Sequence, residues 1–163
     1  MDYSRLSRSE YVGIAAGLIL VLSLFLPWYS LGAGPDVARG DDPAAWACGI
    51  GENSCSAFET FPVLRWLLLV AALSPVVLAL VVLADWETSW PRGELTAIIG
   101  MIAFVLIFFN GLIDRPSQRD IQVHLDWGYF IALLSAAVIF GAGAVRSLDS
   151  GGGAPRRPPG SFG

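Results

Sequence analysis

Four long apolar runs dominate the pattern of hydrophobic and polar positions along the chain. They cover about residues 11–31, 62–83, 95–113 and 127–145, and charged side chains are nearly absent inside them. A run of about 20 apolar residues matches the hydrocarbon core of a bilayer. Backbone groups in lipid must pair within their own segment, so each run is predicted to be a helix. The predicted fold class is therefore all-α, a four-helix transmembrane bundle with up-down-up-down topology.

The first run is expected to remain in the protein as a membrane anchor. It follows Arg5 and Arg8, as the apolar part of a secretory signal would. It ends, however, in the sequence LPWYS at residues 26–30 and not in the small-x-small pattern of a cleavage site. We therefore expect a signal anchor that forms the first span.

Tryptophan and proline positions refine the spans. Pro75 lies inside the second run and is expected to kink its helix, with Ser74 or a neighbouring helix satisfying the freed carbonyl. Amphipathic indole rings prefer the headgroup region of a bilayer. Five tryptophans at or just beyond the ends of the runs are accordingly predicted to form an interfacial belt: Trp28, Trp66, Trp86, Trp90 and Trp127.

Composition agrees with a single membrane domain and suggests its orientation. Only 15% of the 163 residues are charged, against about 25% in soluble domains. Short cytoplasmic loops carry an excess of basic residues. One side of the predicted topology has six arginines, and the other has three, or four with Arg65. The six-arginine side is assigned to the cytoplasm, which gives a multi-pass plasma-membrane protein with both termini cytoplasmic. These six are Arg5, Arg8, Arg92, Arg146, Arg156 and Arg157.

The chain is predicted to consist of a membrane domain, residues 1–146, and a C-terminal tail, residues 147–163. Glycine, proline and serine dominate the tail, which also contains two adjacent arginines. Such a composition cannot bury enough apolar surface to fold. A disordered cytoplasmic tail is therefore expected.

The two cysteines, Cys48 and Cys55, lie together in the loop between the first two spans, which the arginine count places outside. Six residues separate them, including Gly51 and Asn53, which suit a turn. A disulfide is favoured in an oxidising compartment. Two free thiols in a loop are the alternative. Two cysteines alone do not fill a tetrahedral zinc site, so no metal is expected.

Small residues indicate where helices approach one another, because close packing replaces the hydrophobic effect between helices in lipid. Gly13 and Gly17 form a G-x-x-x-G pattern in the first span. Packing inside the bundle and self-association of two copies both fit this pattern, and the first is favoured.

Polar residues near the membrane boundary are the candidate chemistry. Four of them lie at the predicted outer ends of the second and third spans, in positions that suit a pocket for a headgroup, an ion or a partner. The simpler interpretation, which is favoured, is that the arginine of the second span extends to the headgroups and pairs with Asp114 or Glu59. The four candidates are Arg65, Asn110, Asp114 and Arg115.

Several function classes find no support in the sequence. The net charge of −4 does not indicate nucleic-acid binding. The spans contain no mid-membrane carboxylate, which disfavours a proton-coupled transporter. No phosphate-binding loop, zinc-protease motif, nucleophile elbow or paired haem histidines occur, so no cofactor and no catalytic residue is predicted. His124 is better explained as a solvated loop residue than as a base.

Two segments resemble a group of small, uncharacterised four-span membrane proteins of actinobacteria. They are SLFLPWYS at residues 23–30 and GLIDRP at residues 111–116. The resemblance implies the four-span layout and no activity. The order of Trp46, Cys48 and Cys55 is also similar to the first extracellular loop of claudin-type tetraspans. Here the Gly-Leu before the tryptophan is replaced by two alanines, and the loop is too short for the claudin sheet.

Two functions are compatible with these features. The first is a non-enzymatic scaffold or accessory subunit of a larger membrane complex, with an acidic outer loop as its recognition surface. The alternative is a carrier or enzyme that binds a lipid or small molecule at the outer polar cluster. The bilayer is the expected partner in both cases. The loop acids are Asp36, Asp41, Asp42, Glu52 and Glu59.

Overall fold

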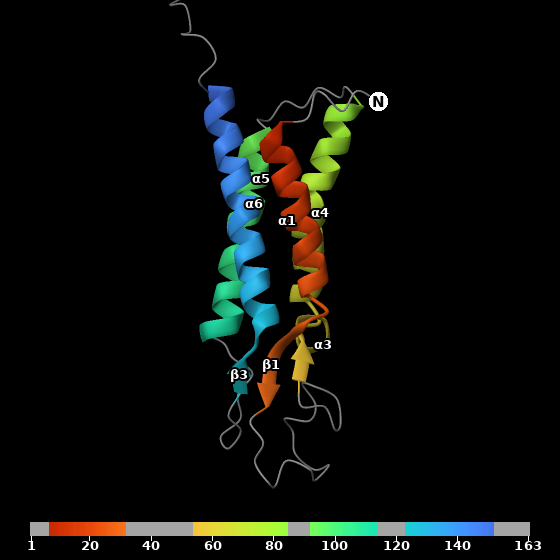
Figure 1. The fold of residues 1–163 in the computed structure, drawn as a ribbon, viewed down its shortest axis with the longest axis vertical. Coiled ribbons are helices and arrows are strands. Elements are labelled where there is room, and N and C mark those ends of the chain that lie inside the picture. The colour runs from red at the N-terminus through yellow and green to blue at the C-terminus, as the bar shows by residue number, and fades with distance from the viewer. Residues whose placement is uncertain (1–6, 32–53, 85–91, 114–122, 152–163) are drawn as a thin grey trace, which may run out of the picture.

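The computed structural model describes residues 7–31, 54–84, 92–113 and 123–151. It is mostly helical, with four long helices packed side by side (Figure 1). These are α1 (Arg8–Ser23), α4 (Leu64–Leu83), α5 (Arg92–Phe108) and α6 (Trp127–Gly151). The last turn of the third long helix is a π-helical segment, η2 (Phe109–Ile113).

Three short strands form an antiparallel sheet at one end of the helices, which we call the sheet end (Figure 1). They are β1 (Pro27–Leu31), β2 (Ser54–Ser56) and β3 (Val123–Leu125), in the order β2-β1-β3. A single-turn helix, α3 (Ala57–Thr60), follows β2. The start of α1 and the end of α6 lie together at the opposite end, which we call the terminal end.

The central strand is irregular where it leaves the helices. Pro27 pairs with Ser56 and Tyr29 with Cys55, so Trp28 is an extra residue in a β-bulge. The carbonyl of Trp28 accepts a hydrogen bond from the backbone N–H of Asp126, just after β3. The sheet was not predicted from the sequence, because each strand has only three to five residues and no clear alternation.

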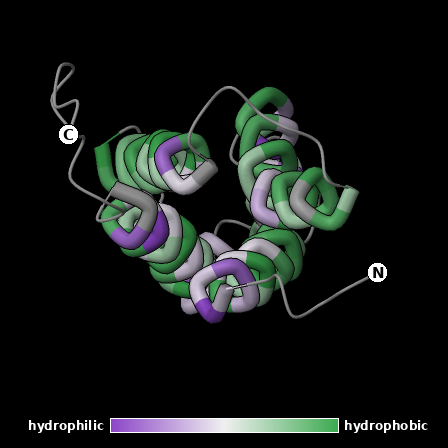
Figure 2. The backbone as a smooth tube through the Cα atoms, turned by 90° about the horizontal axis from the view of Figure 1, so that it is seen from above, coloured by the Kyte–Doolittle hydropathy of each residue, from purple (hydrophilic) through white to green (hydrophobic). Residues whose placement is uncertain are grey.

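Helices α4, α5 with η2, and α6 are long and apolar enough to cross a membrane, over Leu64–Val81, Gly93–Ile113 and Trp127–Asp149. Seen along the helices, apolar positions predominate on their outward faces (Figure 2). Large exposed side chains such as Val70, Leu80 and Leu134 belong to these faces. This outward apolar surface is typical of helices in contact with lipid.

Two predicted boundaries differ from the structure. The first run was expected to be helical through Leu31, but α1 ends at Ser23 with 16 residues, and residues 27–31 form β1. Pro27 has no backbone N–H to continue the helix, and the following residues find partners in the sheet. At the other terminus, α6 continues to Gly151, beyond the predicted end of the fourth span at residue 145. The remaining tail lies outside the described residues.

Serine side chains within the helices are satisfied by their own backbone. Pro75 cannot donate to the carbonyl of Ala71, and the hydroxyl of Ser74 donates to that oxygen instead, at 2.8 Å. This confirms the predicted role of Ser74. In the same way Ser23 donates to Leu20 and Ser135 to Ile131, both at 2.7 Å. The hydrogen-bonding groups of these hydroxyls are therefore satisfied within single helices.

Glycines set the distance between the helices. A Cβ atom at Gly17 would lie 2.3 Å from the carbonyl oxygen of Ala72 in α4, and one at Gly143 would lie 2.3 Å from the backbone nitrogen of Ala97 in α5. Real Cβ atoms do not approach a backbone atom so closely. The backbones of α1 and α4, and of α5 and α6, are thus in direct contact, as small residues permit. Gly13 and Gly17 contact helices of their own chain, as the packing interpretation expects; self-association stays a prediction.

An aromatic core fills the junction between helices and sheet. Trp28 and Tyr129 are fully buried and meet edge to face, with ring centroids 5.7 Å apart. Phe61 lies against both Trp28 and Tyr29. The indole nitrogen of Trp28 donates to the carbonyl of Ser23 at 2.8 Å. Trp28 is therefore a core residue, and its predicted place in the interfacial belt is wrong.

Two other members of the predicted belt are exposed, and their place in the headgroup region stays a prediction. Trp66 and Trp127 are more than half exposed, at 58% and 52%. Each lies near the end of an apolar helix, where an indole ring suits the headgroup region. Trp86 and Trp90 lie outside the described residues.

The glycine contacts give a matched test within α6. Gly143→Ala should lower the free energy of unfolding by about 1–3 kcal/mol, because the added methyl group overlaps the backbone of α5. Gly141→Ala meets no atom within 4 Å and should be neutral, or stabilising by up to about 1 kcal/mol through helix propensity. The stability of each variant is measured by heating the protein in detergent and following the loss of monodisperse protein. An equal loss of stability for the two variants would contradict the direct contact of Gly143 with the backbone of α5.

Candidate functional site

Arg65 lies in the first turn of α4, near the sheet end, with its guanidinium over two aromatic rings that also contact each other. The central carbon of the guanidinium is 4.8 Å from the ring centroid of Phe58 and 5.5 Å from that of Trp66. Its Nη1 donates to the carbonyl oxygen of Phe58 at 3.1 Å. The side chain is therefore held by cation–π contacts and one hydrogen bond.

Asn110 uses its polar groups in a different way. Its side-chain nitrogen donates to the carbonyl of Leu106 at 2.9 Å, next to the change from α-helix to π-helix. Its own carbonyl accepts a hydrogen bond from the hydroxyl of Tyr29 at 3.3 Å. Within the described ranges, no hydrogen bond or ion pair joins Asn110 to Arg65. Asp114 and Arg115 lie outside those ranges, so the predicted four-residue cluster stays a prediction.

Glu59, which was expected as one counter-charge for Arg65, is occupied elsewhere. Its carboxylate accepts hydrogen bonds from the backbone nitrogen and the hydroxyl of Ser56, at 3.2 and 2.9 Å. The backbone nitrogen of Glu59 in turn donates to the hydroxyl of Ser56 at 3.4 Å, and this bond, with the one from the Ser56 nitrogen, forms the capping box of α3. Glu59 is therefore a helix-capping residue of the described structure.

The predicted Cys48–Cys55 bridge involves one residue that the structure does not describe. Cys55 lies in β2, paired with Tyr29 of the central strand, and is buried. Cys48 lies outside the described residues, so the bridge stays a prediction. His124 lies in β3 opposite Ser30 and is exposed, as expected of a solvated residue.

The terminal end contains a charged pair that was not predicted. Glu10 of α1 and Arg146 of α6 form an ion pair, with Oε1 and Nη1 2.5 Å apart. The Glu10 side chain is only 6% exposed, and that of Arg146 20%. The other carboxylate oxygen of Glu10 accepts a hydrogen bond from the backbone nitrogen of Ser7 at 2.7 Å. One carboxylate thus caps α1 and ties it to α6.

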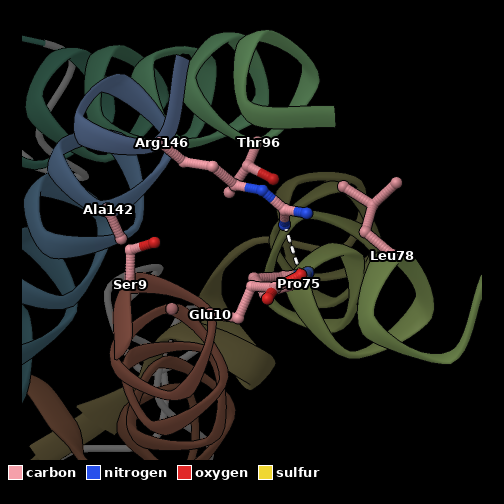
Figure 3. Close-up of a pocket in the computed structure, with 9 residues that line it drawn as sticks. Ser9, Glu10, Pro75, Leu78, Thr96, Ala142 and Arg146 are labelled. Carbon is pink, nitrogen blue, oxygen red and sulfur yellow. Dashed lines mark ion pairs between the residues drawn. The ribbon is translucent and has the colours of Figure 1, made fainter. Parts of the chain in front are cut away.

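A small cavity adjoins this ion pair, and all four long helices contribute to its wall (Figure 3). Its volume is about 10 Å³, the space of about one water molecule. Ser9 and Thr96 supply hydroxyls, and the Arg146 side chain extends across the opening toward Glu10. The remaining wall is apolar and includes Pro75.

The chemistry of this cavity favours a structural role. Its two charges are opposite and in contact, so the pair attracts neither a free cation nor a free anion strongly. A buried pair of this kind stabilises one arrangement of helices against others, since either charge alone would be costly there. Among the residues that the structure describes, no group of three histidine, cysteine or acidic side chains converges as a metal site.

A sequence signal for the Glu10–Arg146 pair did exist. In an up-down-up-down bundle the start of the first helix and the end of the fourth lie on the same side of the membrane. Glu10 immediately precedes the first predicted span, and Arg146 immediately follows the last. The distance between the first and fourth helices, which decides whether the charges meet, is a tertiary property.

Comparisons with protein-family models, with curated proteins and with solved structures find no match for this chain.

The ion pair can be tested with a double-mutant cycle. Glu10→Gln retains an oxygen to cap α1 but loses the charge, and we expect it to lower the free energy of unfolding by about 2–3 kcal/mol, because the largely buried guanidinium of Arg146 then loses its carboxylate counter-charge. Arg146→Gln should cost a similar amount. The double variant should cost clearly less than the sum of the two, as coupled residues do.

Thermal unfolding in detergent is the measurement, with Arg8→Gln as the control. Arg8 is exposed and has the same charge, so its loss should change stability by less than about 0.5 kcal/mol. Additive effects of Glu10→Gln and Arg146→Gln would contradict a functional ion pair.

Proposed function

We propose that this protein is a non-enzymatic scaffold or accessory subunit of a membrane complex, with the loop at residues 32–53 as its recognition surface. In this proposal α1, α4, α5 and α6 each cross the plasma membrane, and both termini are cytoplasmic. The start of α1 and the end of α6 at the same end of the molecule support an even number of spans. The arginine count supplies the direction.

In this proposal α1 is shorter than the other three spans. Sixteen helical residues extend over about 24 Å at 1.5 Å per residue, somewhat less than a hydrocarbon core of about 30 Å. The chain continues through two turn residues toward β1, and Leu24 there is fully buried. The backbone N–H groups of residues 24–26 donate to the carbonyls of residues 21–23, so these polar groups are paired within the segment, which supports a fourth span of helix plus turn.

The observation that carries the proposed function is the way the sheet holds both ends of the first loop. Residue 31 ends β1 and residue 54 begins β2, and Ser30 pairs with Ser54 across the two strands. The loop therefore leaves and re-enters the molecule at neighbouring points of a packed base. A surface loop positioned by a rigid base is the usual arrangement of a recognition element.

The charge of this loop suggests the chemistry of a partner. Residues 32–53 contain four carboxylates against one arginine, a net charge of −3. Complementary potentials steer association and favour the correct partner. A membrane protein with a basic exposed surface is therefore the partner that we propose.

Purification in a mild detergent after crosslinking in intact cells tests the proposed function. The wild-type protein should repeatedly carry the same membrane partner, and the double variant Asp41→Asn/Asp42→Asn should recover several-fold less of it because the loop loses two charges. A protein that always purifies alone would exclude the accessory-subunit proposal.

The matched control changes two acids near the terminal end. Glu94→Gln/Asp149→Asn removes the same charge from exposed positions of α5 and α6 and should leave partner recovery unchanged. Equal recovery with both double variants would show that the loop charge is not what the partner recognises.

We also propose that Cys48 and Cys55 form a disulfide that closes a small ring at the base of this loop. The bridge would stabilise the sheet end by about 2–3 kcal/mol on the chain-entropy model. Intact-mass measurement after alkylation under denaturing conditions should show no added label without reductant and two labels with it. Two labels before reduction would contradict the bridge.

A further inference from the structure

We infer that Arg65, with the rings of Phe58 and Trp66, forms a binding site for the phosphate group of an anionic phospholipid. The site lies where α4 begins, at the first residues of a segment long enough to cross a membrane. This inference does not depend on the proposed recognition loop, because its residues belong to α3 and α4.

The first argument is the uncompensated charge of Arg65. A guanidinium has five N–H groups. One, at Nη1, donates to Phe58, and Nε is buried without a partner. The other N–H groups, on the two terminal nitrogens, have no acceptor among the described residues. No ion pair neutralises Arg65 within this set either.

The second argument is the helix on which this charge lies. The N-terminus of a helix carries a partial positive charge, which favours anions nearby. The first turn of α4 contains no acidic residue and contains Arg65 itself. The backbone N–H groups of residues 65–67 already donate to Phe61 and Val63, so an anion there is held by the guanidinium of Arg65 and favoured by the helix dipole, without free backbone donors from these residues.

The third argument is the geometry of the side chain. The aromatic contacts and the bond to Phe58 fix the guanidinium plane before any ligand arrives. A fixed fork of N–H donors suits two oxygens of one phosphate, and less side-chain entropy is lost on binding. Arg65 is partly exposed, and Nη2 is not among its buried nitrogens, so this atom remains accessible from outside.

The surroundings favour a lipid as the source of the phosphate over a free anion. Trp66 is 58% exposed beside the arginine, and Phe25, which stacks on Phe58 at 5.0 Å, is equally exposed. Both rings suit the headgroup region of a bilayer. Exposed Leu67 and Val70 continue along α4 toward the middle of the helix, where they provide an apolar surface for an acyl chain.

Native mass spectrometry of the full-length protein in detergent, titrated with phosphatidylglycerol, tests the inference. Phosphatidylcholine with the same acyl chains is the comparison lipid. Arg65→Gln should weaken phosphatidylglycerol binding about tenfold, because about 1.4 kcal/mol corresponds to one lost charge-assisted hydrogen bond. Arg8→Gln removes the same charge from an exposed residue at the terminal end and should bind like the wild type. Equal affinity of the two variants for phosphatidylglycerol would overturn the site.

Two further arms complete the experiment. If Arg65→Gln does not fold, Arg65→Lys tests the site instead. Lysine keeps the charge but lacks the planar fork of N–H donors. This variant should reduce the preference for phosphatidylglycerol over phosphatidylcholine at least about threefold. An unchanged preference would overturn the inference. Millimolar inorganic phosphate should not displace the lipid; if it does, the site binds free phosphate and the lipid assignment fails.

Discussion

Contact between helix backbones at glycine positions is the interaction on which the other features of this protein depend. The outward faces of the helices are apolar, and lipid around such helices removes most of the hydrophobic gain from association. Dispersion contacts between close backbones then supply the attraction. Gly17 brings α1 against α4, and Gly100 and Gly143 bring α6 against α5. Glu10 and Arg146 then join α1 to α6, beside a water-sized cavity to which all four long helices contribute.

The two ends of the molecule differ in whether their charged side chains are paired. At the terminal end, opposite charges on the first and last helices meet and neutralise each other. At the sheet end, Arg65 is fixed by aromatic rings without a counter-ion among the described residues, while the nearby carboxylate of Glu59 caps its own helix. Close packing at a glycine also occurs at the sheet end, because a side chain at Gly111 would overlap the ring of Tyr129. The terminal end therefore links the first and last helices through paired charges, whereas the sheet end contains a positive charge without a counter-ion among the described residues.

The sheet joins parts of the chain that are far apart in sequence. Its central strand follows α1, and the outer strands precede α3 and α6. The bulge at Trp28 turns the indole into the core, where it meets Tyr129, so the same few residues close the helices and support the strands. The proposed recognition loop and the proposed lipid site both start from this base. A partner bound to the loop would thus lie close to the headgroups at Arg65.

The sequence by itself determined the helices and the role of Ser74, because length, lack of charge and hydrogen-bonding capacity are local properties. It also indicated Arg65 as a notable boundary residue. Only the tertiary structure decided that Trp28 is buried, that residues 27–31 pair in a sheet, and that Glu10 meets Arg146. Those outcomes depend on which segments lie side by side, and strands of three to five residues gain their stability from partners more than 20 residues away. A periodic pattern within one segment contains no information about such neighbours.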